Sequence, residues 1–126
     1  MKYLAQIVEV STDFEFILKI KIKIKNEILE VFSSSIPTLI DFEKSYLVSL
    51  EAIIFNDYFV QESNSIPEIK QINNSLQYEI TGYLRYGKIE SKGIIFEDEI
   101  LNREFFYLDY FLVKWTVDRI CVDFDV

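Results

Sequence analysis

The side chains that most often carry out enzymatic chemistry are scarce in this sequence. The chain has 126 residues and no histidine, so it lacks the commonest general base, the commonest transition-metal ligand and every Ser-His or Cys-His nucleophile pair. Its single cysteine, Cys121, is surrounded in sequence by aspartates. Neighbouring carboxylates oppose thiolate formation, so we interpret Cys121 as a packed or unreactive residue. The sequence therefore predicts a protein that is not an enzyme.

Two groups of acidic residues remain as candidates for metal binding or acid-base catalysis. They are Glu97, Asp98 and Glu99 in one group and Asp118, Asp123 and Asp125 in the other. A magnesium or calcium site needs several oxygens that converge on one point, whereas adjacent strand residues point to opposite faces. Two paired carboxylates could hydrolyse a glycoside, but only in a substrate cleft. We expect solvated surface charges here, with no metal and no cofactor.

Net charge restricts the partners that this chain could bind. Thirteen Lys and Arg residues against 21 Asp and Glu residues give a net charge of −8, which repels a phosphate backbone at long range. We therefore predict no direct nucleic-acid binding. The same acidity would attract a basic protein and speed the encounter, although it is also a common route to solubility alone.

The densest aromatic stretch is EFFYLDYF, at residues 104–111. A buried strand is the simplest interpretation, but alternation along a strand would place aromatic side chains on both of its faces. One of these faces must then be covered, either by loops of the same domain or by a partner. Tyr107 and Tyr110 lie next to acidic residues in this stretch or close to it, and tyrosines with an acidic rim are typical of protein-binding surfaces.

Lysine alternates with aliphatic residues in ILKIKIKIK, at residues 17–25. In a strand this pattern gives one apolar face and one face of four lysines. We interpret the lysines mainly as protection against edge-to-edge pairing of an otherwise hydrophobic strand. The alternative is a docking site for an acidic partner, including RNA.

Two hairpins position these residues. A loop at Asn26 and Glu27 would place Lys23 opposite Glu30, and the hydrophobic pattern argues against moving the loop back by one residue. In the second hairpin, a loop at Gly87 and Lys88 would place Arg85 opposite Glu90. The same register would place Gly82 opposite Gly93 and leave a thin position that suits a bent sheet.

The other segments are also mostly strands. Residues 46–55 alternate as a central strand that is apolar on much of both faces, and Asn56 and Asp57 could mark a turn or bulge after it. Residues 65–73, with Pro67 near the start, fit a short inserted helix. The apolar phase changes by one residue between Val117 and Ile120, which predicts a β-bulge at Asp118 and Arg119.

Together these elements predict an all-β, mainly antiparallel fold with at most one short helix. A small barrel or a strongly coiled sheet fits this length, and an OB-like barrel is the closest analogy. Length and composition indicate a single domain over residues 1–126. No run of about 18 apolar residues could form a transmembrane helix, and the start, MKYLAQIVEV, does not read as a secretory signal. We expect a cytoplasmic protein that does not bind membranes.

Two functions remain after these exclusions. A small, acidic, aromatic-rich chain without catalytic residues is similar in composition to bacterial immunity proteins, and that resemblance implies an inhibitor that masks a basic toxin or nuclease. The leading expectation is therefore a non-enzymatic protein-interaction module for a basic protein partner. Its expected contact residues are Glu97, Asp98, Glu99, Tyr107, Tyr110, Asp118, Asp123 and Asp125. The alternative is a barrel-type module that binds a small ligand or oligosaccharide, or an assembly subunit.

Overall fold

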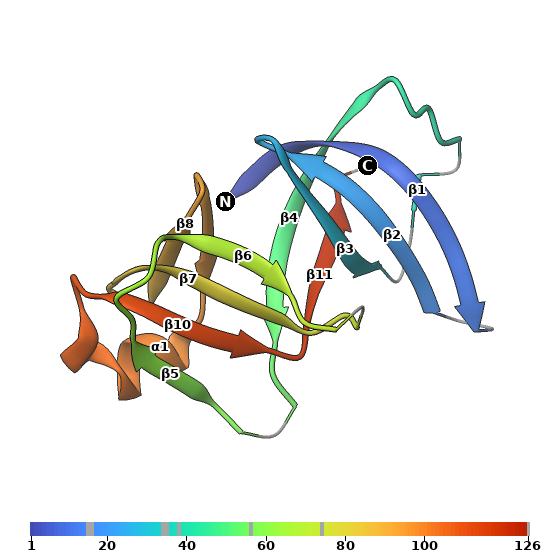
Figure 1. The fold of residues 1–126 in the computed structure, drawn as a ribbon. Helices are drawn as coiled ribbons and strands as arrows, with labels where there is room; N and C mark the ends of the chain where they lie inside the picture. The colour runs from blue at the N-terminus through green and yellow to red at the C-terminus, as the bar shows by residue number, and fades with distance from the viewer. Residues whose placement is uncertain (15–16, 34–35, 38, 56, 74, 126) are drawn as a thin grey trace. The chain divides into compact units, whose positions relative to one another are not determined.

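The structure is a computed structural model that describes residues 1–14, 17–33, 36–37, 39–55, 57–73 and 75–125. Its strands form two compact units (Figure 1). Unit 1 comprises Met1–Glu51 and Ile120–Val126, and unit 2 comprises Ala52–Arg119. Unit 2 is thus an insertion in the chain of unit 1. That residues 1–126 act as a single domain stays a prediction.

Five strands of unit 1 close into a barrel in the order β1-β2-β3-β11-β4. They are β1 (Lys2–Phe14), β2 (Ile17–Ile24), β3 (Glu27–Ser33), β4 (Ser45–Ile53) and β11 (Arg119–Phe124). β1 pairs with β4 to close the barrel, and β11 pairs in parallel with β3. The last strand therefore lies between the third and the fourth, which is the strand order of an OB barrel. The predicted all-β, mainly antiparallel fold with a small barrel is confirmed, and the strand order agrees with the OB-like analogy.

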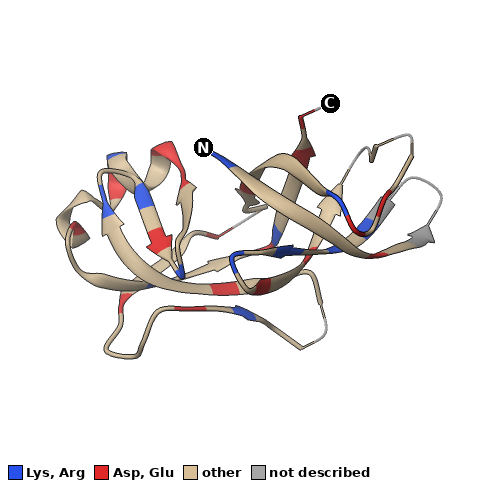
Figure 2. Ribbon diagram, turned by 90° about the horizontal axis from the view of Figure 1, so that it is seen from above, with Lys and Arg blue, Asp and Glu red and all other residues tan. Residues whose placement is uncertain are grey.

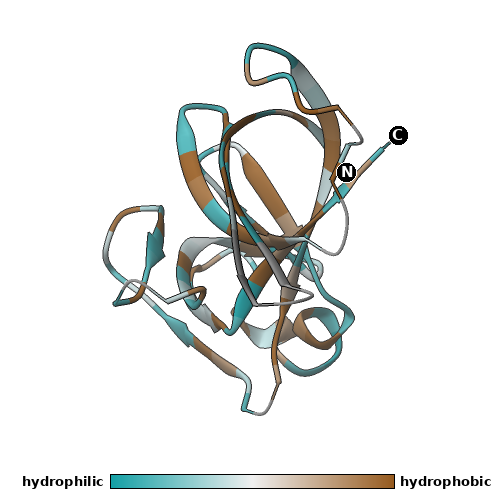
Figure 3. Ribbon diagram, turned by 90° about the vertical axis from the view of Figure 1, so that its right-hand side faces the viewer, coloured by the Kyte–Doolittle hydropathy of each residue, from teal (hydrophilic) through white to brown (hydrophobic). Residues whose placement is uncertain are grey.

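The barrel core follows the alternation that the sequence predicts. Ile20, Ile22 and Ile24 of β2 are buried together with Leu29 and Val31 of β3, while the lysines between the isoleucines point outward. Hydrophobic and hydrophilic residues change places along the strands in Figure 3. Each such strand buries one face because successive side chains alternate across it.

Unit 2 contains a second, antiparallel sheet in the order β5-β10-β7-β8-β9, with β6 also paired to β7. Its strands are β5 (Phe59–Glu62), β6 (Glu68–Gln71), β7 (Tyr78–Arg85), β8 (Lys88–Ser91), β9 (Ile94–Glu97) and β10 (Leu112–Val117). The helix α1 (Glu99–Glu104) and the 3-10 turn η1 (Phe106–Leu108) connect β9 to β10. Trp115, Tyr78 and Phe96 are the largest fully buried side chains of this unit.

Both predicted hairpin registers are wrong by two residues. Lys23 faces Ile28, and Arg85 faces Lys88. Neither Lys23 nor Arg85 therefore lies opposite the glutamate that we expected. The chain turns at Lys25 and Asn26, both with positive φ, and at Tyr86 and Gly87, also both positive. Positive φ at both central residues is the type I′ geometry, whose twist matches that of the paired strands. A shift of two residues leaves every side chain on its predicted face.

Gly82 does not face Gly93. One edge of β7 pairs with β6 before Gly82 and with β8 after it. A Cβ atom at Gly82 would collide with the backbone of Glu90. Gly93 instead occupies a turn with φ 81°. As we expected, both glycines are needed by the backbone. Gly82 allows a close approach of two strands, and Gly93 allows a tight turn.

Three further predictions need correction. Residues 65–73 contain strand β6 and no helix, and the helix lies at α1, where the Asp98 carboxylate accepts a hydrogen bond from Ile100 N at 2.9 Å. The aromatic stretch forms η1 and a turn because it connects α1 to β10. The phase change near Asp118 is real, but it separates β10 from β11, which belong to different sheets. Asn56 lies outside the described residues.

Within the part of the chain that the structure describes, no helix has the length and apolar character needed to cross a bilayer. The cytoplasmic location stays a prediction.

Candidate functional site

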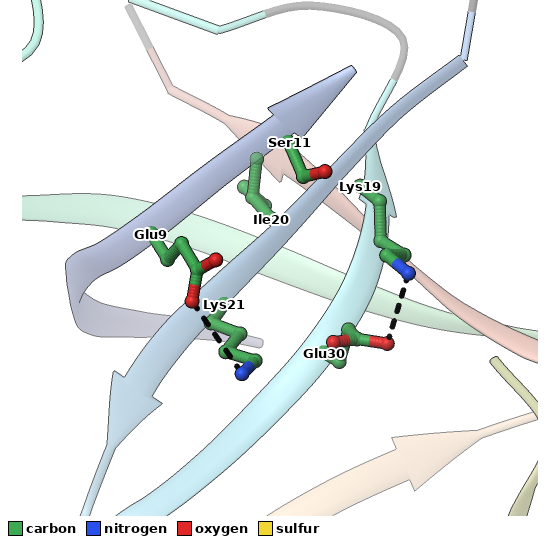
Figure 4. A pocket seen from close by; sticks show the side chains of 6 residues that line it. All are labelled: Glu9, Ser11, Lys19, Ile20, Lys21 and Glu30. Carbon is green, nitrogen blue, oxygen red and sulfur yellow. Dashed lines mark ion pairs between the residues drawn. The ribbon is translucent and has the colours of Figure 1, made fainter. Parts of the chain in front are cut away.

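The lysines of β2 lie on an inner strand of the barrel and not on an edge. β2 pairs with β1 on one side and with β3 on the other, so protection of a sheet edge is the wrong interpretation. The Lys19 ammonium lies 3.5 Å from the Glu30 carboxylate of β3, and the Lys21 ammonium lies 3.4 Å from the Glu9 carboxylate of β1 (Figure 4). The alternation of lysines thus forms cross-strand ion pairs.

A shallow hollow of about 110 Å³ lies among these four charged residues, with Ser11 and Ile20 completing its lining. Figure 4 shows each lysine extended toward the carboxylate of a neighbouring strand. Two ammonium groups and two carboxylates leave the lining without net charge. The hollow therefore lacks the excess positive charge that phosphate recognition requires.

A different surface lies at one end of unit 2, where three segments meet. The turn between β7 and β8 lies against α1, since Asp98 N donates to Gly87 O at 3.0 Å and a Cβ on Gly87 would lie 2.8 Å from Cβ of Asn102. The chain after η1 joins the end of β7, because Tyr110 N donates to Leu84 O at 2.6 Å. We call this surface the acidic–aromatic end and define it by Tyr86, Glu97, Asp98, Glu99, Phe106, Tyr107, Asp109 and Tyr110.

Tyr86 and Tyr110 form a fixed pair within the acidic–aromatic end. Their hydroxyl oxygens are 2.6 Å apart, and their rings meet edge to face with centroids 5.9 Å apart. The Arg85 guanidinium lies over both rings, at 5.7 and 5.8 Å from the centroids. The hydrogen bond to Tyr110 raises the pKa of Tyr86 above its ordinary value. The Tyr86 hydroxyl therefore stays protonated at neutral pH.

The backbone at this pair is held in an unusual conformation. Tyr86 has φ 50° and Tyr110 has φ 72°, in the left-handed region that bulky residues rarely adopt. The Asp109 carboxylate accepts a hydrogen bond from Tyr86 N at 3.2 Å, so neighbouring groups stabilise the strained positions. Positive φ at Tyr86 belongs to the type I′ turn of the β7–β8 hairpin, and the hydroxyl contact with Tyr110 fixes the ring at the tip of that turn.

A second group of rings continues from η1. Phe106 and Tyr107 meet edge to face, and Tyr107 also contacts Phe105, which stacks on Tyr58 at 5.6 Å. Burial, together with the negative charges of Asp98 and Glu104, raises the pKa of Tyr58 well above its ordinary value. Tyr58 is thus an inner support for the exposed rings, and the acidic residues lie close enough to influence it.

Five of the eight predicted contact residues belong to the acidic–aromatic end. They are Glu97, Asp98, Glu99, Tyr107 and Tyr110. Asp98 is also the N-cap of α1, so its carboxylate has a structural role. Figure 2 shows that acidic and basic positions are interspersed along the ribbon and do not form one acidic tract.

The other three predicted residues lie elsewhere. Asp118 accepts a hydrogen bond from Phe55 N at 2.6 Å and fixes the chain between β10 and β11. Asp125 is 2.7 Å from the Lys2 ammonium, and Asp123 lines a hollow on the barrel wall together with Cys121. Among the described residues, no group of three or more Cys, Asp or Glu could hold a metal ion.

Sequence reasoning missed three members of this surface, Tyr86, Phe106 and Asp109, and its neighbour Arg85. Tyr86 precedes Gly87, and a turn centred on these two residues would have exposed the tyrosine at its tip. The sequence instead predicts the loop at Gly87 and Lys88, one residue later. Phe106 was assigned to a strand, so its exposure at a turn could not be anticipated.

Comparison with models of known protein families gives a match over nearly the whole chain. The model of the family described as Uncharacterised conserved protein UCP019853 matches residues 1–125, and the chain therefore belongs to this family. No curated protein and no solved structure gives a significant match.

Proposed function

We propose that this member of the family is a non-enzymatic protein-interaction module that binds and masks a basic protein partner through the acidic–aromatic end. An immunity-type inhibitor of a basic toxin or nuclease is the specific form that we favour. The observation that carries the proposal is a pair of exposed tyrosines, Tyr86 and Tyr110, fixed by hydrogen bonds beside Asp109. The exposed ring of Tyr107 is held by contacts with its neighbours Phe105 and Phe106. Tyr86, Tyr107 and Tyr110 are 59%, 63% and 63% exposed.

Preorganisation is the first argument for binding. An exposed aromatic ring that is free to rotate loses conformational entropy when a partner immobilises it. Tyr86 and Tyr110 are already joined by a hydroxyl contact and fixed by backbone hydrogen bonds. Their rings have therefore already lost most of this conformational entropy in the free protein. Tyrosine is also among the residues that contribute most to protein interfaces.

Charge is the second argument. Unit 2 contains eleven acidic and seven basic side chains, and unit 1 contains ten and six, so each unit has a net charge of −4. Both units would therefore attract a basic partner at long range. At the acidic–aromatic end, Glu97 and Glu99 are exposed on either side of Asp98, whose backbone N–H donates to Gly87 O. Exposed charges of this kind act mainly on the association rate.

The second candidate is ligand binding by the barrel. The OB strand order supports it, because OB barrels commonly bind oligonucleotides or oligosaccharides on the face of their second and third strands. On that face, however, the hollow measures only about 110 Å³ and its charges are paired with one another. The acidic–aromatic end offers the larger set of exposed anchors.

Affinity capture from extracts of the source organism tests the proposal. The wild-type chain should retain a basic protein in stoichiometric amount, and a chain with Tyr107→Ala and Tyr110→Ala should lose it. The matched control replaces Leu4 and Leu47, two exposed residues of unit 1, by Ser and should retain the partner. Equal capture by all three chains, or no stoichiometric basic partner, would refute the proposal.

A further inference from the structure

A groove crosses the outer face of the sheet in unit 2. Two adjoining hollows, of about 280 and 160 Å³, share Phe59 and Thr116 in their linings. The larger hollow is also lined by Gln61, Glu79 and Lys114, together with Tyr58 and Val60, and the smaller one by Gln77. We call this the sheet groove and define it by Phe59, Gln61, Gln77, Glu79, Lys114 and Thr116. It does not include any residue of the acidic–aromatic end.

The register explains how strands place these side chains on one face. Thr116 of β10 faces Phe59 on β5 and Glu79 on β7, and Lys114 faces Gln61 on β5. Their neighbours in β10, Trp115 and Val117, point to the opposite face and are buried. The groove is thus the solvent face of the sheet, opposite the core of unit 2.

The lining combines one exposed aromatic ring with polar groups of both hydrogen-bonding types. Phe59 is 61% exposed, which is unusual for a phenylalanine in a strand. Around it, glutamine amides and a threonine hydroxyl can each donate and accept hydrogen bonds. The Lys114 ammonium lies 3.7 Å from the Glu79 carboxylate, and both side chains are about one-third exposed. Their charges therefore compensate each other within the groove.

We infer that the sheet groove binds a neutral oligosaccharide. A pyranose ring presents C–H groups on its faces and hydroxyls around its edge. The electron-rich face of Phe59 attracts the C–H groups, while the surrounding amides, hydroxyl and ion pair satisfy the hydroxyls. The two adjoining hollows accommodate successive sugar units. Asp57 and Asp118, which also line the smaller hollow, repel an acidic sugar.

An extended peptide is the other class of ligand that a sheet edge can bind, since β5 is the end strand of its sheet in the observed order. Such a peptide needs pockets for alternate side chains. Of the apolar side chains that line the sheet groove, Phe59 is exposed, whereas Tyr58 and Val60 are half-buried. The remaining lining is polar, so the groove does not supply a row of such pockets. The chemistry of the lining therefore favours the saccharide.

Nuclear magnetic resonance titration of the ¹⁵N-labelled full chain tests the inference. The probes are the neutral hexasaccharides of cellulose, xylan, mannan, starch and chitin, each added to millimolar concentration. At least one should shift the amides of Phe59, Gln61 and Thr116. Phe59→Ala should weaken that binding by about tenfold or more, equivalent to 1.4 kcal/mol. Phe42→Ala, which removes an exposed ring of unit 1, should not change it.

Three results would overturn the inference. The first is the absence of any shift in the sheet groove with all five saccharides. The second is equal binding of oligogalacturonate, which the aspartates should repel. The third is a response of β5 to an extended peptide but to none of the saccharides. None of these results bears on the acidic–aromatic end, whose residues do not line the groove.

Discussion

At the scale of single residues, the acidic side chains divide into two classes that composition alone could not distinguish. Asp98 caps α1 and Asp118 anchors Phe55 N, so both stabilise the fold. Glu97 and Glu99 are exposed, with no such hydrogen bond recorded among the described residues. Only the second class is suited to testing recognition without changing the structure.

Reversing the two exposed charges should slow binding of the basic partner. Glu97→Lys with Glu99→Lys places positive charge at the acidic–aromatic end, so the association rate should fall at low salt and recover at high salt. Asp123→Lys in unit 1 is the matched control and should change the rate less. Stopped-flow or surface plasmon resonance kinetics measure both. An association rate that is the same in all variants would exclude the acidic rim as a steering surface.

Removing the cap should act on stability. Asp98→Ala deletes the acceptor for Ile100 N, so the free energy of unfolding should fall by about 1 kcal/mol. Asp98→Asn keeps an acceptor at the cap and should restore most of this loss. Urea denaturation measures both variants. Equal stability of Asp98→Ala and the wild type would show that α1 does not depend on this hydrogen bond.

Tyr58 provides a prediction about pH. Its pKa in the folded chain is raised above the ordinary value of 10.0, so the folded state keeps a proton that the unfolded state loses. The contribution of the Tyr58 hydroxyl to the free energy of unfolding is therefore fully present below about pH 10 and declines as the pH rises above that value. Tyr58→Phe should lose less stability between pH 9 and pH 11. Identical pH dependence in both chains would contradict the burial of the Tyr58 hydroxyl.

At the scale of elements, the faces of the strands were predictable and their registers were not. Alternation in β2 assigned the isoleucines to the core and the lysines to the outside, because side chains alternate whatever the partner strand is. The exact register depends on which two loop residues adopt positive φ. Asn26 and Gly87 do so readily, but Lys25 and Tyr86 carry no sequence preference for it. The loops were therefore placed one residue too late.

A turn substitution tests this account of the hairpins. Lys92 has φ 55° ahead of Gly93, and asparagine tolerates that conformation better than lysine does. Lys92→Asn should raise the free energy of unfolding by up to about 1 kcal/mol. Lys88→Asn, in strand β8, should not raise it, because asparagine is unfavourable in strands. Thermal denaturation compares them. A destabilised Lys92→Asn chain would contradict the type I′ geometry that positive φ at both Lys92 and Gly93 gives this turn.

Gly82 offers a second test at this scale. A methyl group at this position would collide with the backbone of Glu90, so β7 and β8 would have to separate. Gly82→Ala should lower the free energy of unfolding by about 1–3 kcal/mol. Urea denaturation measures the change. A stability equal to that of the wild type would mean that the two strands do not approach each other this closely.

At the scale of the whole molecule, the fold class was predictable and the division into two units was not. Period-two alternation over most of the chain indicated an all-β fold, and the five-stranded barrel agrees with it. The insertion of residues 52–119 between β4 and β11 has no signal in composition, since the chain has only three glycines and two prolines. The candidate site was predicted only in part. The sequence shows tyrosines and acidic residues that are typical of a binding surface. It does not show the hydrogen bonds between distant segments that bring these residues together.

The central claim is that the acidic–aromatic end contacts a basic protein, and site-specific photo-crosslinking tests it most directly. A photo-reactive phenylalanine analogue replaces Tyr107 in one chain and Leu47, exposed in unit 1, in another. Each chain is irradiated in extracts of the source organism, and the products are identified by mass spectrometry. The account predicts one basic protein crosslinked in high yield from position 107 and little or none from position 47. No crosslinked protein from position 107, or equal yields from both positions, would contradict it.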